Sequence, residues 1–283
     1  MPSVAHAIAE AALPAAVAVV LLAVMLRDVT RARLERFARR QQLPITPENA
    51  ITVVNYLATV RRWRVCGFVA GVVIEDACTF TQHGAWHVGA SIIGPGALIG
   101  WFVGALVAEW RVESQRHAGP RRTASLAARR LRDYIPRWFA TVTAVLWVIA
   151  IAAALFAIIR LGVAAPSLAV LAAALLATPI CGVVARRVVN RPQSPAAPDV
   201  LAADDALRSR SLHVLTGCTL ALNGMLAAFG LSVVLMSGSG LGVYSPLAAL
   251  LGSIVVPFLG WLAATSPFGA RRSFPVGVRA GVA

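Results

Sequence analysis

Lysine is absent from this chain, whose 26 basic residues are all arginine. Without lysine the protein cannot form a Schiff base with a carbonyl cofactor, hold a nucleotide with a P-loop lysine or use lysine as a general base. A count of seven helices therefore cannot indicate a rhodopsin. Nucleophile-elbow, HExxH, glycine-rich nucleotide-loop and nucleic-acid-binding motifs are also absent. The sequence thus predicts no catalytic residue and no cofactor.

Cysteine and charge are scarce. None of the four cysteines lies in a CxxC pair, so Cys66, Cys78, Cys181 and Cys218 are expected to be buried free thiols. Hydrophobic residues make up 58% of the chain and charged residues 13%, with a mean hydropathy of +0.74. The net charge of +14 lies between apolar runs that approach or exceed the roughly 20 residues needed to span a bilayer. This pattern favours a multi-pass membrane protein that meets anionic headgroups and binds no nucleic acid.

The apolar runs predict an all-α fold, a polytopic transmembrane helix bundle of about seven spans, with the N-terminus outside and the C-terminus inside. We expect a single integral membrane domain over residues 1–283. The expected spans are about 4–26, 63–81, 87–108, 138–159, 165–185, 212–236 and 246–265. The arginines fall mainly in three cytoplasmic loops and a tail, with amphipathic helices expected in the loops: 27–62, 109–137, 186–211 and 266–283.

The second span is weak by itself, because Glu75 and Asp76 each oppose insertion by roughly 2.5–3.5 kcal/mol if charged near its centre. The distribution of arginine decides in its favour. If residues 63–108 form a hairpin, 25 of the 26 arginines lie on one side and only Arg160 lies outside. We therefore expect the third span to help the second into the membrane.

Glu75, Asp76 and Asn223 form the candidate intramembrane polar site. Glu75 and Asn223 each lie about 16 Å into their spans, near the middle of the apolar core. Two roles remain open for these residues: structural hydrogen bonding between helices, or handling of a proton or solute.

His83 and His87 follow Asp76 at helical spacing, in the style of a site with two histidines and one carboxylate. The chain has to reverse direction near Gly84, which argues for a helix break between the two histidines. The alternative is that both histidines lie at the outer surface without a ligand role. We predict no metal site.

Small residues recur every four positions in the third span, at Gly96, Gly100, Gly104 and Ala108. At this spacing they share one helix face and let a second backbone approach closely. We expect a packing face inside the bundle, with a homodimer face as the alternative.

Two helices are expected beside the second and sixth spans. Thr46 as N-cap and Pro47 as the first helical residue would start an amphipathic helix, whose apolar side would carry Ile51, Val54, Leu57 and Ala58. Asp199 would cap a short, solvent-exposed structural helix in which Asp204 pairs with Arg208 four residues later.

The loop 109–137 holds the candidate docking residues. A helix from Ser125 to Pro136 would place Arg129, Arg130 and Arg132 away from its apolar face. This arginine cluster would lie on anionic lipid or bind a soluble partner protein.

Four segments resemble a group of actinobacterial multi-pass membrane proteins of unassigned activity. They are 121–126 (RRTASL), 130–138 (RLRDYIPRW), 191–193 (RPQ) and 203–209 (ADDALRS). The resemblance covers about the middle half of the chain and lies in the loops. It implies a bacterial plasma-membrane location and no activity.

Three functions are compatible with these features. The first is a non-enzymatic membrane subunit or accessory protein, whose arginine-rich cytoplasmic helices bind lipid headgroups or a partner protein, with a homo-oligomer as the alternative assembly. The second is a small-solute or proton-coupled transporter that uses Glu75 and Asp76, with Asn223 lining the path. The third is a membrane-embedded enzyme.

The hairpin topology predicts that a Gly84→Cys variant, in a background without other cysteines, reacts with a membrane-impermeant thiol reagent added outside the cell. The reason is that residue 84 would join the two spans at the outer surface. Labelling only from the cytoplasmic side would contradict the topology.

Overall fold

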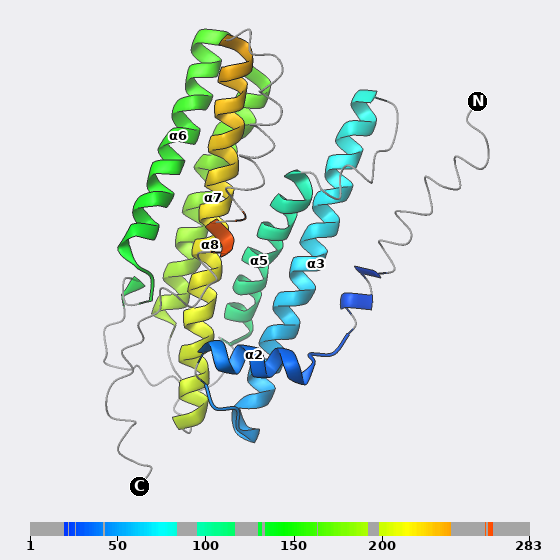
Figure 1. The fold of residues 1–283 in the computed structure, drawn as a ribbon, viewed down its shortest axis with the longest axis vertical. Coiled ribbons are helices and arrows are strands. Elements are labelled where there is room, and N and C mark those ends of the chain that lie inside the picture. The colour runs from blue at the N-terminus through cyan, green and yellow to red at the C-terminus, as the bar shows by residue number, and fades with distance from the viewer. Residues whose placement is uncertain are drawn as a thin grey trace, which may run out of the picture.

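The computed structural model describes residues 20–21, 23–25, 27–41, 43–83, 95–116, 130–131, 134–162, 164–191, 198–238, 258 and 260–262. Throughout these residues the chain is helical or irregular, with no β-strand, as the sequence predicts. The helices are α2 (Arg31–Gln41), α3 (Pro47–His83), α5 (Pro95–Arg116), α6 (Arg137–Leu161), α7 (Ala164–Asn190) and α8 (Pro198–Gly238), as Figure 1 shows.

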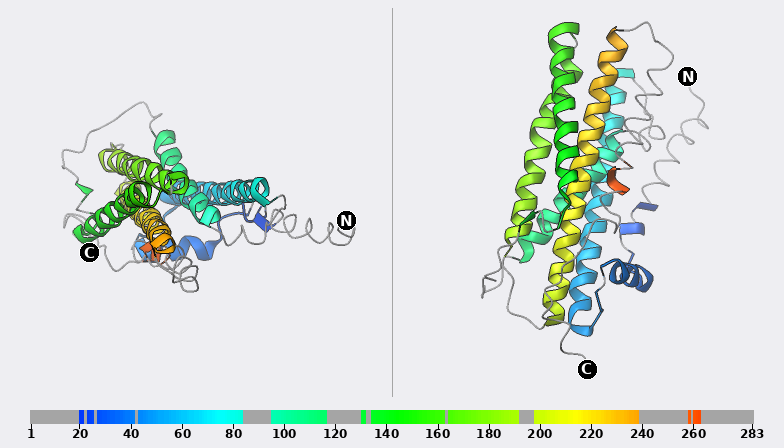
Figure 2. Two further views of the ribbon diagram at one scale, coloured as in Figure 1. Left: turned by 90° about the horizontal axis from the view of Figure 1, so that it is seen from above. Right: turned by 60° about the vertical axis from the view of Figure 1, so that its left-hand side comes forward.

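The helices form two packed groups. α6, α7 and α8 pack against one another, while α3 packs along α5 and both also contact α8. Seen end-on, α3 and α5 extend to one side of the other group (Figure 2). One end of the bundle collects the starts of α3, α6 and α8 and the ends of α5 and α7, and α2 lies across it (Figure 1). We call this the arginine-rich end.

Three helices in the described part of the chain are long and apolar enough to cross a membrane: Arg137–Leu161, Val170–Asn190 and Asp199–Leu235. Apolar side chains on them are exposed, among them Ile159 (73%) and Leu176 (62%). The expected spans 4–26 and 246–265 lie almost entirely outside the described residues, and the turn 84–94 and the tail 266–283 lie wholly outside them.

α3 and α8 each join two expected elements into one unbroken helix. The amphipathic helix and the second span form α3, and the helix from Asp199 and the sixth span form α8. Apolar side chains from both extensions pack with Phe37 of α2 in one buried cluster. Arg208 is fully buried there, so the solvent-exposed helix expected at 199–211 is wrong. Because the apolar face of residues 199–211 is buried, the helix continues past residue 211 into the expected sixth span.

The apolar side expected for the start of α3 is also wrong. Ile51 is 68% exposed, whereas Val53, Tyr56 and Val60 are buried. The helix uses a face about a third of a turn away, because α2, α5 and α8 all cover that side. α5 likewise continues to Arg116, well beyond the expected end of the third span.

The N-terminus of α3 lies where Thr46 and Pro47 predict it, but Thr46 does not cap it with its side chain. Instead Asn49, which is fully buried, accepts a 3.0 Å hydrogen bond from the Thr46 main-chain N–H through Oδ1. Its Nδ2 donates to the Pro44 carbonyl at 2.9 Å. This is one of the two bonds of a capping box, in which the side chain of the third helical residue accepts the main-chain N–H of the N-cap residue.

The α-helix expected from Ser125 does not continue to Pro136. Tyr134 and Ile135 form a turn whose main-chain N–H groups both donate to the Leu131 carbonyl at 3.1 Å. Pro136 restricts the residue before it and stands as N-cap of α6, which begins at Arg137. Most of the segment 117–133 lies outside the described residues.

Glycine pairs bring α3 and α5 into backbone contact. Gly67 and Gly71 of α3 lie against Gly96, Gly100 and Gly104 of α5 so closely that a Cβ atom at any of these five positions would overlap neighbouring atoms, mostly main chain. The two helices run antiparallel, so each step of four residues along α3 matches a step of four back along α5. The small-residue face therefore packs within the chain, against α3.

We expect Gly100→Ala to destabilise the fold by about 1–3 kcal/mol, because the new methyl group cannot fit beside the Gly67 main chain. Gly182→Ala is the matched control, since a Cβ at Gly182 meets nothing within 4 Å. That change should be neutral or stabilise α7 by about 0.5–1 kcal/mol. Thermal unfolding in detergent, followed by circular dichroism, measures both, and equal midpoints would contradict the close approach.

Candidate functional site at the arginine-rich end

A buried tyrosine–carboxylate pair joins α3 to α5. The Tyr56 hydroxyl donates a 2.9 Å hydrogen bond to Oε1 of Glu109. Their exposed fractions are 3% and 1%, and the ring of Phe37 in α2 covers Tyr56 with its centroid 6.5 Å away. No described residue donates a hydrogen bond to Oε2 of Glu109. Oε2 of this buried carboxylate is therefore unsatisfied among the described residues. An unsatisfied buried acceptor costs stability, so it marks a place where a ligand or another donor would bind favourably.

Burial raises the pKa of the Glu109 carboxyl. The adjacent Ser211 and Tyr56 hydroxyls and the charges of Arg64 and Arg210 act in the opposite direction, since they favour the carboxylate. Burial also raises the pKa of the Tyr56 hydroxyl, and the nearby Glu109 charge raises it further. Tyr56 therefore stays protonated and serves as donor.

Arg64 lies against two indole rings. Its Cζ is 5.8 Å from the ring centroid of Trp101 in α5 and 5.0 Å from that of Trp261. Cation–π attraction of this kind stabilises a guanidinium that has lost part of its water. Nε and Nη2 of Arg64 are buried, and no described residue accepts a hydrogen bond from either. The side chain is thus held by aromatic faces and keeps two donors for another group.

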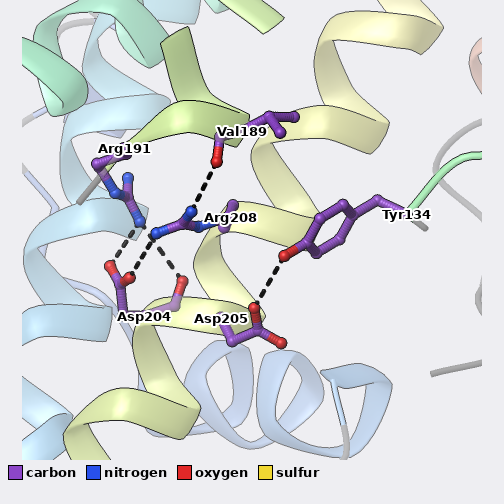
Figure 3. A network of polar contacts seen from close by, with 6 residues as sticks. All are labelled: Tyr134, Val189, Arg191, Asp204, Asp205 and Arg208. Carbon is purple, nitrogen blue, oxygen red and sulfur yellow. Dashed lines mark hydrogen bonds and ion pairs between the residues drawn. The ribbon is translucent and has the colours of Figure 1, made fainter. Parts of the chain in front are cut away.

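A second polar network joins α7 to α8 (Figure 3). Asp204 accepts hydrogen bonds from Nη2 of Arg191 at 2.5 Å and from Nη2 of Arg208 at 3.2 Å. Arg208 also donates to the Val189 carbonyl at 2.9 Å through Nη1. The expected Asp204–Arg208 pair is present, but it is buried and shared with Arg191. Breaking it would leave a buried charge unpaired, so this network fixes the start of α8.

Tyr134 extends this second network toward the loop before α6. Its hydroxyl donates to Oδ1 of Asp205 at 3.1 Å (Figure 3). Tyr134 packs against a cluster of buried side chains from α6, α7 and α8.

The predicted intramembrane residues lie apart from this end, at two different helix contacts. Oε2 of Glu75 accepts a 2.7 Å hydrogen bond from the Gly96 main-chain N–H, at the start of α5. Asp76 is buried, with 3% of its surface exposed. Asn223 is fully buried on α8 and accepts a 3.0 Å hydrogen bond through Oδ1 from the Thr178 hydroxyl of α7. The structure therefore places Glu75 at the contact between α3 and α5, with Asp76 next to it in the chain, and Asn223 at a different contact, between α7 and α8.

The remaining predicted site residues are placed as follows. Ala108 is fully buried in the cluster beneath α2. Arg130 is exposed, and Arg129 and Arg132 lie outside the described residues. His83 is the last residue of α3, its side chain is not described, and His87 lies outside the described residues. In the part of the chain that the structure describes, no three His, Cys, Asp or Glu side chains are grouped as metal ligands.

The Tyr56–Glu109 pair and the contact of Arg64 with two indole rings are not predicted by the sequence, which indicates a loop that starts at Glu109. The signal was present in the helical spacing. Glu109 lies four residues after Ala105, which is fully buried, and three before Val112, also buried. Continuing the apolar face of α5 by one turn would have placed the carboxylate on it.

The arginine-rich end has more guanidinium groups than carboxylates. The buried or half-buried arginines are Arg64, Arg191, Arg208 and Arg210, and the carboxylates among them are Glu109, Asp204 and Asp205. Arginine donors in a site with little water bind carboxylate or phosphate groups strongly. The arrangement suits anion binding.

Comparison of the chain with protein-family models, curated proteins and solved structures gave no match.

We expect Tyr56→Phe to destabilise the protein by about 1–3 kcal/mol, because it leaves the buried Glu109 carboxylate without its donor. Losing that donor raises the pKa of Glu109 further. The substitution should therefore cost more at about pH 8, where the carboxylate must stay charged, than at about pH 5, where a proton can neutralise it. Chemical unfolding at both pH values measures the effect.

Tyr134→Phe is the control, since the hydroxyl of Tyr134 bonds a carboxylate that is only partly buried. It should cost less than about 1 kcal/mol. Equal costs for the two variants would contradict a special role of burial at Glu109.

Proposed function

We propose that this protein is a seven-span integral membrane protein of a bacterial plasma membrane, with the arginine-rich end in the cytoplasm. We propose further that it acts as a non-enzymatic subunit or accessory protein, whose arginines bind anionic lipid headgroups or a partner protein. The observation that carries this proposal is the bond between Glu75 and the start of α5.

The Glu75 carboxylate acts as a helix cap. Its Oε2 accepts the Gly96 N–H, one of the first groups of α5 that lack a partner within the helix. A negative charge at that place is also stabilised by the helix dipole. An acid held in this way holds α3 to α5. This supports the structural role over a role in carrying a proton or solute.

Exposed apolar side chains surround the Glu75 cap and support a membrane position for α3 and α5. On α3, Val73 is 58% and Ile74 is 64% exposed, and on α5 Ile99 is 40% and Val103 is 45% exposed. Surfaces of this kind are typical of helices that face lipid. α3 carries Glu75 and Asp76 within its expected span, and backbone contact with α5 is a way to offset the cost of inserting them.

Exposed tryptophans support the proposed orientation. Trp110, near the end of α5, is 55% exposed, and Trp138, at the start of α6, is 53% exposed. Both lie at the arginine-rich end, where indole rings would meet the headgroup region beside the arginines. An arginine-rich end of this composition is favoured on the cytoplasmic side.

A transporter is the second candidate, and one observation favours it. Nδ2 of the fully buried Asn223 has no hydrogen-bond acceptor among the described residues. The neighbouring α7 carries Pro179 beside Thr178, and proline interrupts the hydrogen-bond ladder of a helix. A polar group of a solute could therefore bind between α7 and α8.

Affinity purification from native membranes in mild detergent, followed by mass spectrometry, tests the proposal. We expect a stoichiometric protein partner with the wild-type chain and a loss of that partner when Arg129, Arg130 and Arg132 are all changed to glutamine. The double variant Glu75→Gln, Asp76→Asn is the matched control. It changes two charges far from the arginine-rich end and should retain the partner.

The opposite pattern would establish the second candidate. It consists of a partner-free wild-type preparation that conducts protons into liposomes containing a pH-sensitive dye, with loss of that flux in the Glu75→Gln, Asp76→Asn variant.

A further inference from the structure

Arginines of α2 and α3 lie at the arginine-rich end. α2 contributes Arg33, and α3 contributes Arg61 and Arg64, which are about one helical turn apart. Burial lowers the pKa of Arg33, and the charges of Arg61, Arg64 and Arg36 lower it further. Every charged neighbour that acts on Arg33 in this way is itself an arginine. Arg61 also bonds the main chain just before α2, which places it beside the start of the helix that carries Arg33.

Arg61 is held in place by the main chain that precedes α2. Its two terminal nitrogens donate to the carbonyls of Arg27 and Asp28, the latter at 3.3 Å. Its Nε is buried and has no acceptor among the described residues. These bonds orient the guanidinium and leave one donor for a further acceptor.

Arg64 supplies two more donors of the same kind. Trp101 and Trp261 both lie against its guanidinium. Nε and Nη2 have no acceptor among the described residues, and they form one edge of the guanidinium, which a phosphate or carboxylate engages with two parallel bonds. Among the described residues, the ion pairs of arginine involve Glu35 and Asp204, and neither joins Arg33, Arg61 or Arg64.

We propose that Arg33, Arg61 and Arg64 form a binding site for the phosphate group of an anionic phospholipid. Three guanidinium groups that repel one another gain most from a shared anion, and buried donors without acceptors gain most from one with several oxygens. This proposal rests on the membrane orientation proposed above and adds a defined site to it.

The level of the site in the fold selects phospholipid as the source of the phosphate. Trp63 and Trp101 lie beside Arg64, and Arg111 stacks over Trp63 with its Cζ 5.4 Å from the ring centroid. Indole and guanidinium groups together are typical of the headgroup layer. A lipid phosphate is present there at high local concentration.

Native mass spectrometry of the full-length protein in mixed micelles tests the site. The micelles contain phosphatidylglycerol and phosphatidylcholine, and the measured quantity is the apparent affinity for retained phosphatidylglycerol. Arg33→Gln, Arg61→Gln and Arg64→Gln should each weaken it about tenfold, the loss expected for one charge-assisted contact. Arg62→Gln and Arg31→Gln are matched controls, because both arginines are exposed and belong to the same two helices. They should change it less than about twofold.

Three results would overturn the site. Equal losses in all five variants would mean that the protein attracts lipid by diffuse charge. Full competition by inorganic phosphate at millimolar concentration would make a free anion the ligand in place of lipid. Unchanged retention in Arg33→Gln would remove α2 from the site. All three leave the proposed accessory role standing, because that role depends on co-purification.

Discussion

Backbone contact between α3 and α5 determines the positions of the polar groups in this half of the protein. Five glycines lie against one another's main chains, so the two helices approach closely, in the register that glycine–glycine contact at residues 67, 71, 96, 100 and 104 defines. That register places Glu75 at the first N–H groups of α5 and, further along, Tyr56 opposite Glu109. It also brings the Arg64 main chain beside Gly104. A side chain at the glycine face would separate all of these partners together.

The half formed by α6, α7 and α8 is fixed differently, by small side chains and buried hydrogen bonds. Alanines of α6 face α8, and Gly230 packs against Ala153. Trp147 donates through Nε1 to the Ala174 carbonyl of α7 at 2.9 Å. At the arginine-rich end the shared carboxylate of Asp204 takes over this role. A buried ion pair adds little net stability, but it penalises other alignments of the helices that share it.

The sequence predicted what depends on local periodicity and composition. The all-α class, the small-residue face of α5 and the Asp204–Arg208 pair follow from spacing along one helix. The sequence-based prediction failed where the burial of a helix face depends on which neighbouring helix covers it. The start of α3 has apolar residues on more than one side, and the presence of α2, α5 and α8 selects Tyr56 over Ile51 for burial. Glu109 looked like the first residue of a loop because its charge interrupts an apolar run. The partner Tyr56, 53 positions away, helps to stabilise it in the buried position.

The two longest helices have a mechanical consequence. α3 has 37 residues and α8 has 41, about 55 and 60 Å of uninterrupted helix. Both run from the arginine-rich end through the depth at which Glu75 and Asn223 lie. They act as stiff levers with no hinge between the two levels. A charged surface or a docked protein that pulls on the arginines at one end would therefore tilt a whole helix. The opposite end of the bundle would then move as well.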